Sequence, residues 1–402
     1  MMPNGWEKKA FGEIVKLSKT KYNPMKSDRC FPCIELEHIA QGTGQILGSA
    51  PASSLASIKN KFQAGDIIFG KLRPYLRKYA SPTFEGVCSS EIWVFDPTNK
   101  VTNPYLFQFV QTDKFISEAN KSAGSKMPRA DWGVVSEMVV PLPPISEQQK
   151  VAKILSTWDE AINTTDRLID NSKQQKKALM QQLLTGKKRL FDESGKQFEG
   201  ELDEYKIRDL FELRGRVGWK GYSKEDLRSS GPLAIGGTQV SKHHRITLKK
   251  PVYLSTEKFD ESPEIKLENG DIILVKTGNT IGKSAIYDPA IGDATINPNT
   301  VILRQVNPKV DIYYFHEIMK GEHFQKVLWD FVAVGAQPSV NQKNIYSMKV
   351  LLPTLQEQKK ISKILSILNQ EIELFEKQLA DLNQEKKALM QQLLTGKRRV
   401  KV

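Results

Sequence analysis

The sequence is poor in cysteine and has no long hydrophobic run. It contains 3 cysteines among 402 residues. So small and odd a number argues against a disulfide framework and favours a reducing compartment, so we expect a cytoplasmic protein. The opening stretch MMPNGWEKKAFGEIVKLS has no apolar segment of the kind found in signal peptides, and no stretch approaches the length of a membrane span. These absences predict a chain that is neither secreted nor embedded in a membrane.

The sequence also lacks the motifs of common nucleotide- and metal-dependent enzymes. Residues 276–284, KTGNTIGKS, resemble a phosphate-binding loop, but three residues rather than four separate its glycines, and the AIYDP that follows has the pattern of a strand. Residues 297–300, NPNT, are not the Asn-Pro-Pro-aromatic tetrad of an amino-methyltransferase. Cys30 and Cys33 form a single CxxC pair and Cys88 is isolated, so zinc is not expected. We expect no catalytic residue, no metal and no cofactor on this chain.

Positive charge, in contrast, is in excess. The chain has 59 Lys and Arg against 46 Asp and Glu, a net charge of +13 and a pI of about 9.3. Such a balance favours a polyanionic partner, with nucleic acid as the first choice. The length of 402 residues leaves room for two or three domains with cores of their own.

The strongest signal in the sequence is a repeat. KKALMQQLLTGK at residues 176–187 returns at residues 386–397, and LPPISEQQKVAKILS at residues 142–156 is answered by LPTLQEQKKISKILS at residues 352–366, a period of 210 residues. Apolar residues recur at heptad spacing through both copies, which indicates two long helices packed on each other. The predicted seam consists of Val151, Leu155, Trp158, Ile162, Ile169, Leu179 and Leu183 in the first copy and Ile361, Leu365, Leu368, Ile372, Phe375, Leu379, Leu382, Leu389 and Leu393 in the second, with a break at Lys386.

Both predicted helices have recognisable ends. Ser146 with Gln149 forms a candidate capping box for the first helix, and Thr354 with Glu357 does so for the second. A glycine followed by basic residues stands where each helix should stop. We therefore expect two helices of about 40 residues each.

The repeat extends into the segments that precede the helices. AGDIIFGK at residues 64–71 is similar to NGDIILVK at residues 269–276, whereas the loops around them differ. We expect an α+β fold in which two similar mixed α/β domains are separated by two long antiparallel coiled-coil helices with pseudo-two-fold symmetry. The predicted boundaries are 1–145 for the first domain, 146–187 for the first helix, 188–204 for a linker, 205–352 for the second domain and 353–402 for the second helix.

Basic and polar residues gather in loops at corresponding places of the two domains. Residues 71–79, KLRPYLRKY, interleave cations with tyrosines; cations bind phosphates, and Arg can pair with guanine edges. A solvated strand face is the alternative there. GSKMPRAD at residues 124–131 and GAQPSVN at residues 335–341 form a second matched pair. The predicted DNA-contacting residues are Lys71, Arg73, Tyr75, Arg77, Lys78, Lys126 and Arg129 in the first domain and Lys242, His243, His244, Arg245, Lys276, Thr277, Asn279, Gln337, Ser339 and Asn341 in the second.

Two variable domains, each followed by a nearly identical helix that ends in KKALMQQLLTGK, resemble the specificity subunit of a Type I restriction-modification system. The resemblance covers essentially the whole chain and includes the helix openings EQQKVAKIL and EQKKISKIL. It implies that each domain is a target recognition domain that reads one half of a split double-stranded DNA site, while the helices act as spacer and docking surface. It also implies that S-adenosylmethionine and adenine methylation belong to two modification subunits, that cleavage of foreign DNA belongs to motor-nuclease restriction subunits, and that this chain is non-catalytic.

Two other classes of function remain open at this point. A self-sufficient restriction or methyltransferase enzyme with diverged motifs would bind S-adenosylmethionine as an isolated chain. A coiled-coil scaffold that does not read DNA would leave sequence preference unchanged when the first domain is exchanged.

Overall fold

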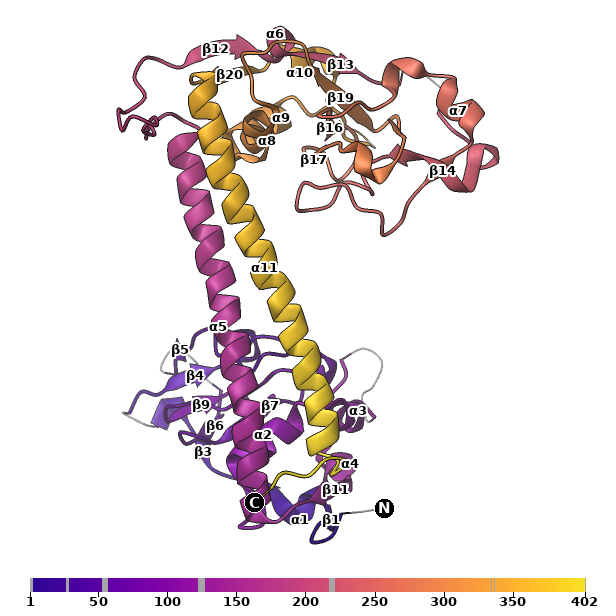
Figure 1. The fold of residues 1–402 in the computed structure, drawn as a ribbon. Coiled ribbons are helices and arrows are strands. Elements are labelled where there is room, and N and C mark those ends of the chain that lie inside the picture. Colours follow the sequence, from indigo (N-terminus) through magenta and orange to yellow (C-terminus); the bar gives the residue numbers. More distant parts are fainter. Residues whose placement is uncertain are drawn as a thin grey trace. The chain divides into compact units, whose positions relative to one another are not determined.

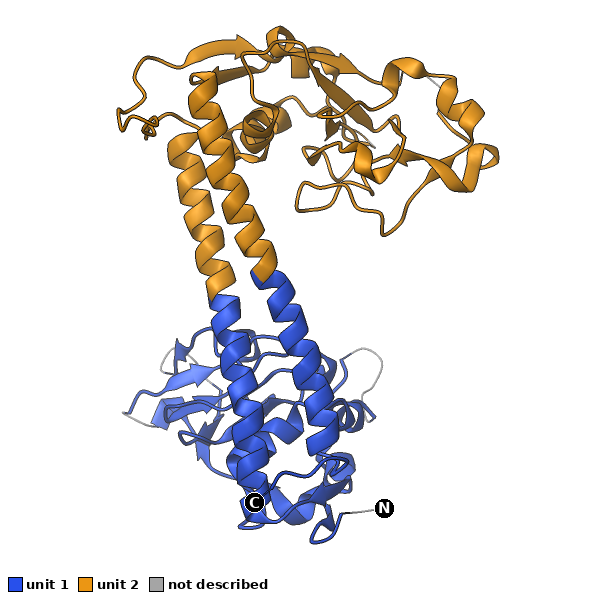
Figure 2. Cartoon of the chain, viewed as in Figure 1, with its two compact units in different colours: residues 1–167, 375–402 blue, residues 168–374 orange. Residues whose placement is uncertain are grey.

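The computed structural model describes residues 3–26, 29–52, 57–121, 127–216, 221–333, 335 and 337–401. The chain forms two compact units, Met1–Arg167 with Phe375–Val402, and Leu168–Leu374 (Figure 2). Each unit combines a body of strands and short helices with part of two long helices, α5 (Ile145–Leu183) and α11 (Leu355–Leu393) (Figure 1). Among the described residues, none of the helices has both the length and the apolar character that a membrane span requires.

The described part of the first unit's body contains a two-stranded sheet, β1-β11, two larger sheets and four short α-helices. An antiparallel four-stranded sheet has the order β2-β10-β7-β8, and a five-stranded sheet has the order β3-β6-β9-β4-β5, with β4 and β9 parallel. The strands are β1 (Glu7–Ala10), β2 (Val15–Leu17), β3 (Lys21–Tyr22), β4 (Pro32–Ile34), β5 (Ala50–Pro51), β6 (Lys59–Phe62), β7 (Ile67–Gly70), β8 (Tyr79–Ala80), β9 (Gly86–Cys88), β10 (Ile92–Pro97) and β11 (Val139–Leu142). The helices are α1 (Phe11–Ile14), α2 (Asn103–Val110), α3 (Asp113–Asn120) and α4 (Trp132–Ser136).

The body of the second unit repeats the first sheet. Its antiparallel four-stranded sheet has the order β13-β19-β16-β17, and a three-stranded sheet has the order β15-β14-β18. The strands are β12 (Asp203–Lys206), β13 (Phe211–Arg214), β14 (Leu227–Ile235), β15 (Tyr253–Leu254), β16 (Ile272–Val275), β17 (Ser284–Ile286), β18 (Ala294–Ile296), β19 (Thr300–Gln305) and β20 (Lys349–Leu352). The helices are α6 (Ile207–Leu210), α7 (Thr256–Asp260), α8 (Ile312–Lys320), α9 (Glu322–Asp330) and α10 (Gln342–Ser347). In each unit the strand before the long helix pairs with the first strand of the body, β11 with β1 and β20 with β12.

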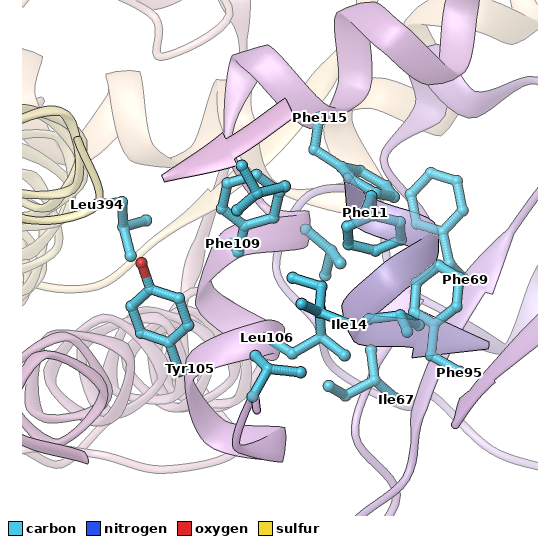
Figure 3. Packing of buried hydrophobic residues seen from close by; sticks show 14 of the residues in the cluster. Phe11, Ile14, Ile67, Phe69, Phe95, Tyr105, Leu106, Phe109, Phe115 and Leu394 are labelled. Carbon is cyan, nitrogen blue, oxygen red and sulfur yellow. The ribbon is translucent and has the colours of Figure 1, made fainter. Parts of the chain in front are cut away.

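The matched strand motifs form the centre of each body because both of their faces are buried. Ile67 and Phe69 of β7 pack in one core with the short helices, whereas Ile68, on the opposite face, packs with the five-stranded sheet. Strand β16 divides its side chains between two cores in the same way. A strand buried on both faces needs a continuous apolar run, which explains the IIFG and IILV sequences. Figure 3 shows Phe69, Phe11 and Phe115 in this core; the ring centroid of Phe115 lies 5.1 Å from that of Phe69 and 5.4 Å from that of Phe11.

Within each unit the two long helices run antiparallel, which confirms the predicted pairing. In the first unit, Leu155 near the start of α5 shares a core with Leu393 at the end of α11. In the second unit, Leu183 at the end of α5 shares a core with Ile361 near the start of α11. None of the predicted seam residues is exposed: Val151, Leu155, Ile169, Leu183, Ile361, Leu365, Ile372 and Leu393 are buried, and Trp158, Ile162, Leu179, Leu368, Phe375, Leu379, Leu382 and Leu389 are half-buried.

The helix ends confirm the predicted stops and correct the predicted capping boxes. Gly186 and Gly396 have φ angles of 71° and 73°, the left-handed conformation that ends helices. The hydroxyl of Thr354 accepts a hydrogen bond from the backbone N of Glu357 at 3.4 Å, so Thr354 caps α11, but the carboxylate of Glu357 accepts from Arg189 and from the backbone N of Leu190, and only half of this capping box forms. The capping box proposed for Ser146 is wrong, because α5 already begins at Ile145 and a proline occupies the cap position.

Candidate nucleic-acid interface

The loop that joins β7 to β8 in the first unit carries most of the predicted cations. It is a single 3-10 turn (Pro74–Leu76) flanked by Arg73 and Arg77, whose φ angles of 52° and 50° lie in the left-handed region. For a residue with a side chain this region costs about 1–2 kcal/mol relative to the right-handed one. The loop therefore has a shape that its own sequence does not favour, and the surroundings of each arginine have to stabilise it.

The loop that joins β16 to β17 in the second unit follows the same backbone path. Gly278 and Gly282 take the places of the two arginines, with φ angles of 93° and 89°. Matching hydrogen bonds define the correspondence: the backbone N of Arg73 donates to Pro128 O at 2.7 Å, and that of Gly278 donates to Pro338 O at 2.8 Å. Because glycine adopts a left-handed φ freely, the second loop reaches this shape without strain.

Two of the predicted cations in the first loop are engaged within the fold. Arg77 donates to the backbone O of Gln111 at 3.2 Å and forms an ion pair with Asp113 at the start of α3. Lys78 Nζ donates to two backbone oxygens of the segment after β4, at 2.7 and 2.9 Å. These contacts account for the left-handed φ of Arg77 and fix the loop to the body.

The other predicted residues of this loop are open to solvent or partly so. Arg73 is exposed, Tyr75 is 51% exposed and Lys71 is half-buried. Within the described part of the chain, no hydrogen bond or ion pair holds the side chain of any of these three residues. A β-bridge brings Arg129 next to the loop, where its Nε donates to Glu91 at 3.0 Å while its side chain stays 48% exposed. The structure thus gathers cations and an aromatic ring at one edge of the first body.

The second unit brings mainly uncharged polar residues to the corresponding edge. A β-bridge between Thr277 and Ser339 joins the loop to the segment before α10, and Asn279 and Gln337 are exposed. Lys276 is half-buried, and this burial lowers its pKa. Amides and hydroxyls can both donate to and accept from base edges, so this edge suits base reading more than phosphate binding.

One further predicted residue, Asn341, is exposed but already has a contact within the fold. The side chain of Asn341 accepts a hydrogen bond from the backbone N of Lys343 at 2.9 Å and caps α10, as Asp131 caps α4 in the first unit. Lys126 lies outside the described residues.

The predicted basic run before β15 is split between surface and interior. Lys242 and His243 are exposed. His244 has a φ of 56°, and its Nδ1 lies 3.1 Å from the hydroxyl of Ser284. Burial lowers the pKa of His244 to about 4, so the ring is uncharged at neutral pH. Arg245 forms a 2.7 Å ion pair with a carboxylate of α11. Lys242, His243 and Arg245 are therefore at the surface, with Arg245 already held in an ion pair, whereas His244 is turned into the fold. For all seventeen predicted residues, DNA contact stays a prediction.

Two buried glutamates at the helix starts make ion pairs that the sequence analysis missed. Glu357 accepts from Arg189 Nη2 at 2.6 Å and from its Nε at 3.0 Å. Glu147 accepts from Arg399 Nη2 at 2.7 Å and from the indole N of Trp6 at 3.0 Å. Burial opposes the ionisation of Glu147, but the hydrogen bonds outweigh it and lower its pKa. In both copies, basic residues follow the glycine that ends the helix, and these residues were the sequence signal for the two ion pairs.

The described residues contain no group of three or more His, Cys, Asp or Glu side chains that could hold a metal ion. Cys33 and Cys88 are free and buried, and Cys30 is exposed. Burial, followed by the charge of Glu35, raises the pKa of Cys33 to about 11, so its thiol is uncharged at neutral pH.

Solved structures share this fold across the whole chain. The S subunit of a Type-I restriction-modification system from M. genitalium superposes with a TM-score of 0.61 at 14% identity, covering 97% of this chain and 96% of the other. A chain from a structure of the type I R-M system, described for its complex assembly and conformational transition, superposes with a TM-score of 0.58 at 18% identity, covering 99% and 100%.

Relatives in sequence point the same way. The Type I restriction enzyme MjaVIII specificity subunit of Methanocaldococcus jannaschii is 26% identical over 425 aligned positions, covering 100% of this chain and 94% of that subunit. The EcoDI specificity subunit of Escherichia coli is 26% identical over 204 positions, covering 50% of this chain and 43% of that subunit. The family described as Type I restriction modification DNA specificity domain matches residues 3–171 and 199–384. The chain therefore belongs to the family of Type I restriction-modification DNA specificity subunits.

Proposed function

We propose that this chain reads a bipartite DNA target with a fixed gap, and that each body reads one half. The observation that carries the proposal is the pair of equivalent loops, one after β7 and one after β16. They have the same backbone path and bridge to equivalent segments, yet one presents Arg73 and Tyr75 and the other presents Asn279 and Thr277. A constant frame with different side chains at the same edge suits two bodies that read different bases.

We further infer that the chain acts without catalysis of its own, in the cytoplasm, as part of a larger complex. Family membership supports two modification subunits that bind S-adenosylmethionine and methylate adenine, and restriction subunits that cleave foreign DNA. The long helices α5 and α11 would then act as the spacer and as the docking surface for these subunits. The relatives named above are specificity subunits, so they favour neither a self-sufficient enzyme nor a scaffold that does not read DNA.

The test is a domain exchange. Because β12 pairs with β20, residues 203–352 should be replaced as one block by the same block of a homologous subunit. Mapping the methylated sites of cells that carry the hybrid with the modification subunits should show one half-site changed, the other half-site kept and the gap unchanged. The matched control replaces residues 7–142, the block closed by β1 and β11, and should change the opposite half. A hybrid that alters both halves, or neither, contradicts the divided reading.

A further inference from the structure

A buried polar cluster joins the body of the first unit to its helices. Lys386 interrupts the apolar seam of α11 and is 7% exposed. Its Nζ donates to Asp159 of α5 at 2.5 Å and to the side-chain O of Gln111 at 2.7 Å. Gln108 of α2 donates to the other oxygen of Asp159 at 2.7 Å. In this unit the helix supplies the carboxylate and the body supplies uncharged amides.

The second unit contains the same cluster with the charges rearranged. Lys176 of α5 takes the place of Lys386, and its Nζ lies 3.9 Å from one oxygen of Glu317 on α8. The other oxygen of Glu317 accepts from Lys320 at 2.7 Å and from Asn369 of α11 at 3.1 Å. Here the body supplies the carboxylate and the helix supplies the uncharged amide.

The repeat establishes which residues correspond. Lys176, which is half-buried, and Lys386 are separated by the 210-residue period of the helices, and so are Asp159 and Asn369. Gln108 and Glu317 each lie three positions after a buried tyrosine of α2 and α8. The lysine therefore occupies the same position in both units, whereas the carboxylate beside it belongs to the helix in the first unit and to the body in the second.

A second contact between body and helix also differs between the units, one helical turn further on. Gln45 donates to Asn163 at 2.7 Å in the first unit, and Arg245 donates to Glu373 at 2.7 Å in the second. Asn163 and Glu373 each lie four residues after the helix residue of the cluster, on the same face of the helix. At two positions one turn apart, the helix residue and the body residue that faces it thus differ together between the two units.

We propose that these facing residues match each recognition body to its own segment of the helix pair. The physical reason is that removing one partner of a buried ion pair leaves the other charge without compensation in a poorly polarisable environment. A body with Gln108 needs an aspartate on the facing helix, because it brings no carboxylate for the buried lysine. A body with Glu317 brings its own carboxylate together with Lys320, so it tolerates either Asp or Asn there.

Point substitutions in the natural chain test the rule. Asp159→Asn removes the carboxylate from Lys386 and should lower the Tm of the full-length protein by about 6–12 °C. Adding Gln108→Glu recreates the arrangement of the second unit and should restore most of that loss. Glu160→Gln, an exposed position of the same helix, is the matched control and should leave the Tm within about 1 °C. A single variant as stable as the control, or a double variant as unstable as the single one, would overturn the proposal.

Duplicated bodies test the predicted asymmetry. A chain in which residues 7–142 also replace residues 203–352 leaves Lys176 facing amides alone, so it should be the less stable hybrid, and Asn369→Asp should stabilise it. A chain in which residues 203–352 also replace residues 7–142 has two carboxylates and two lysines in the cluster and should need no rescue. Equal stability of the two hybrids, or no effect of Asn369→Asp, contradicts the rule.

The proposal rests on the two bodies being exchangeable recognition domains. Because thermal unfolding needs no DNA, a failure of this proposal is distinguishable from a failure of the proposal that each body reads one half-site.

Discussion

The two units use one backbone plan and place different side chains on it at the loops that we assign to DNA. After β7, two arginines occupy left-handed conformations; after β16, two glycines occupy the equivalent conformations. The contacts of Arg77 with α3 explain one of the strained residues. Arg73 has no such partner within the described residues, although its backbone is equally strained. Backbone hydrogen bonds hold Arg73 in its conformation, but no contact among the described residues uses its side chain. Strained backbone is typical of functional positions, and it singles out Arg73 in this loop.

The helix ends show the opposite behaviour, because there the side chains are the same in both units. Glu147 and Glu357 are both held by an arginine that follows the other helix. Gln148 and Gln358 both donate to the proline carbonyl before the helix, at 3.0 and 2.9 Å. The side chains at the helix ends are the same in the two units, which indicates a structural role. The side chains of the loops differ between the units, which fits their proposed role in DNA recognition.

Substitution of the helix-end glutamates should have the largest effect on stability. Glu357→Ala removes a carboxylate that is 1% exposed and leaves Arg189 without its partner, so the free energy of unfolding should fall by about 3–5 kcal/mol. Urea unfolding of the full chain measures it, with Glu371→Gln on the exposed face of α11 as the matched control. Glu147→Ala should cost a similar amount if the two ends are equivalent. A loss in only one of the two variants would break the comparison between the units.

The ion pair at Glu147 predicts that the stability of the fold depends on pH. The pKa of Glu147 is lower in the folded state than in the unfolded state, so the folded state binds fewer protons at this site than the unfolded state does. Its contribution to stability is therefore complete above about pH 4.5, the ordinary glutamate range, and is lost as the pH falls through the folded pKa. Unfolding of the wild type and Glu147→Gln between about pH 3 and 6 should converge at the acid end; parallel curves would contradict this assignment.

The glycines of the second loop should have the next largest effect, and they should differ from each other. A methyl group on Gly282 would lie 2.2 Å from the side-chain O of Gln325, whereas nothing lies within 4 Å at Gly278. Gly282→Ala adds this clash to the backbone strain and should lower the free energy of unfolding by about 2–4 kcal/mol. Gly278→Ala carries the backbone strain alone and should cost about 1 kcal/mol. Urea unfolding with equal losses for both variants would mean that backbone strain alone decides this loop.

Much of the frame could be predicted from the sequence, because it depends on periodic patterns. The heptad seam identified α5 and α11, and the matched motifs AGDIIFGK and NGDIILVK identified β7 and β16 as equivalent segments of the two units. The roles within the first loop could not be predicted in this way. In KLRPYLRKY, Arg73 and Arg77 look equivalent, and only the fold brings Asp113 to one of them. The polar cluster around Lys386 could not be predicted for the same reason. Lys386 appears in the sequence as a break in the heptad seam, but its partners are distant in sequence.

The smallest effect should be the change in DNA affinity when single arginines of the first loop are removed. Arg73 is exposed, strained and without a partner among the described residues, so Arg73→Ala should weaken DNA binding by the complete complex while stability changes by less than about 0.5 kcal/mol. Arg77 is held by Asp113, so Arg77→Ala should mainly destabilise the loop, by about 1 kcal/mol after allowance for the partial exposure of that pair.

The form of the loss identifies what Arg73 contacts. A phosphate contact lowers affinity for every sequence and reduces the salt slope by roughly one, and Arg73→Lys should then retain most of the affinity. A contact with a guanine edge instead costs about 1–3 kcal/mol at one position of the target, and Lys replaces Arg poorly because it lacks the bidentate fork. Binding titrations at several salt concentrations, on the target and on sites with single changed base pairs, separate the two. If Arg73→Ala leaves both affinity and salt slope unchanged while Arg77→Ala alters them, the exposed arginine is not the one that meets DNA, and the contrast drawn between the two loops fails.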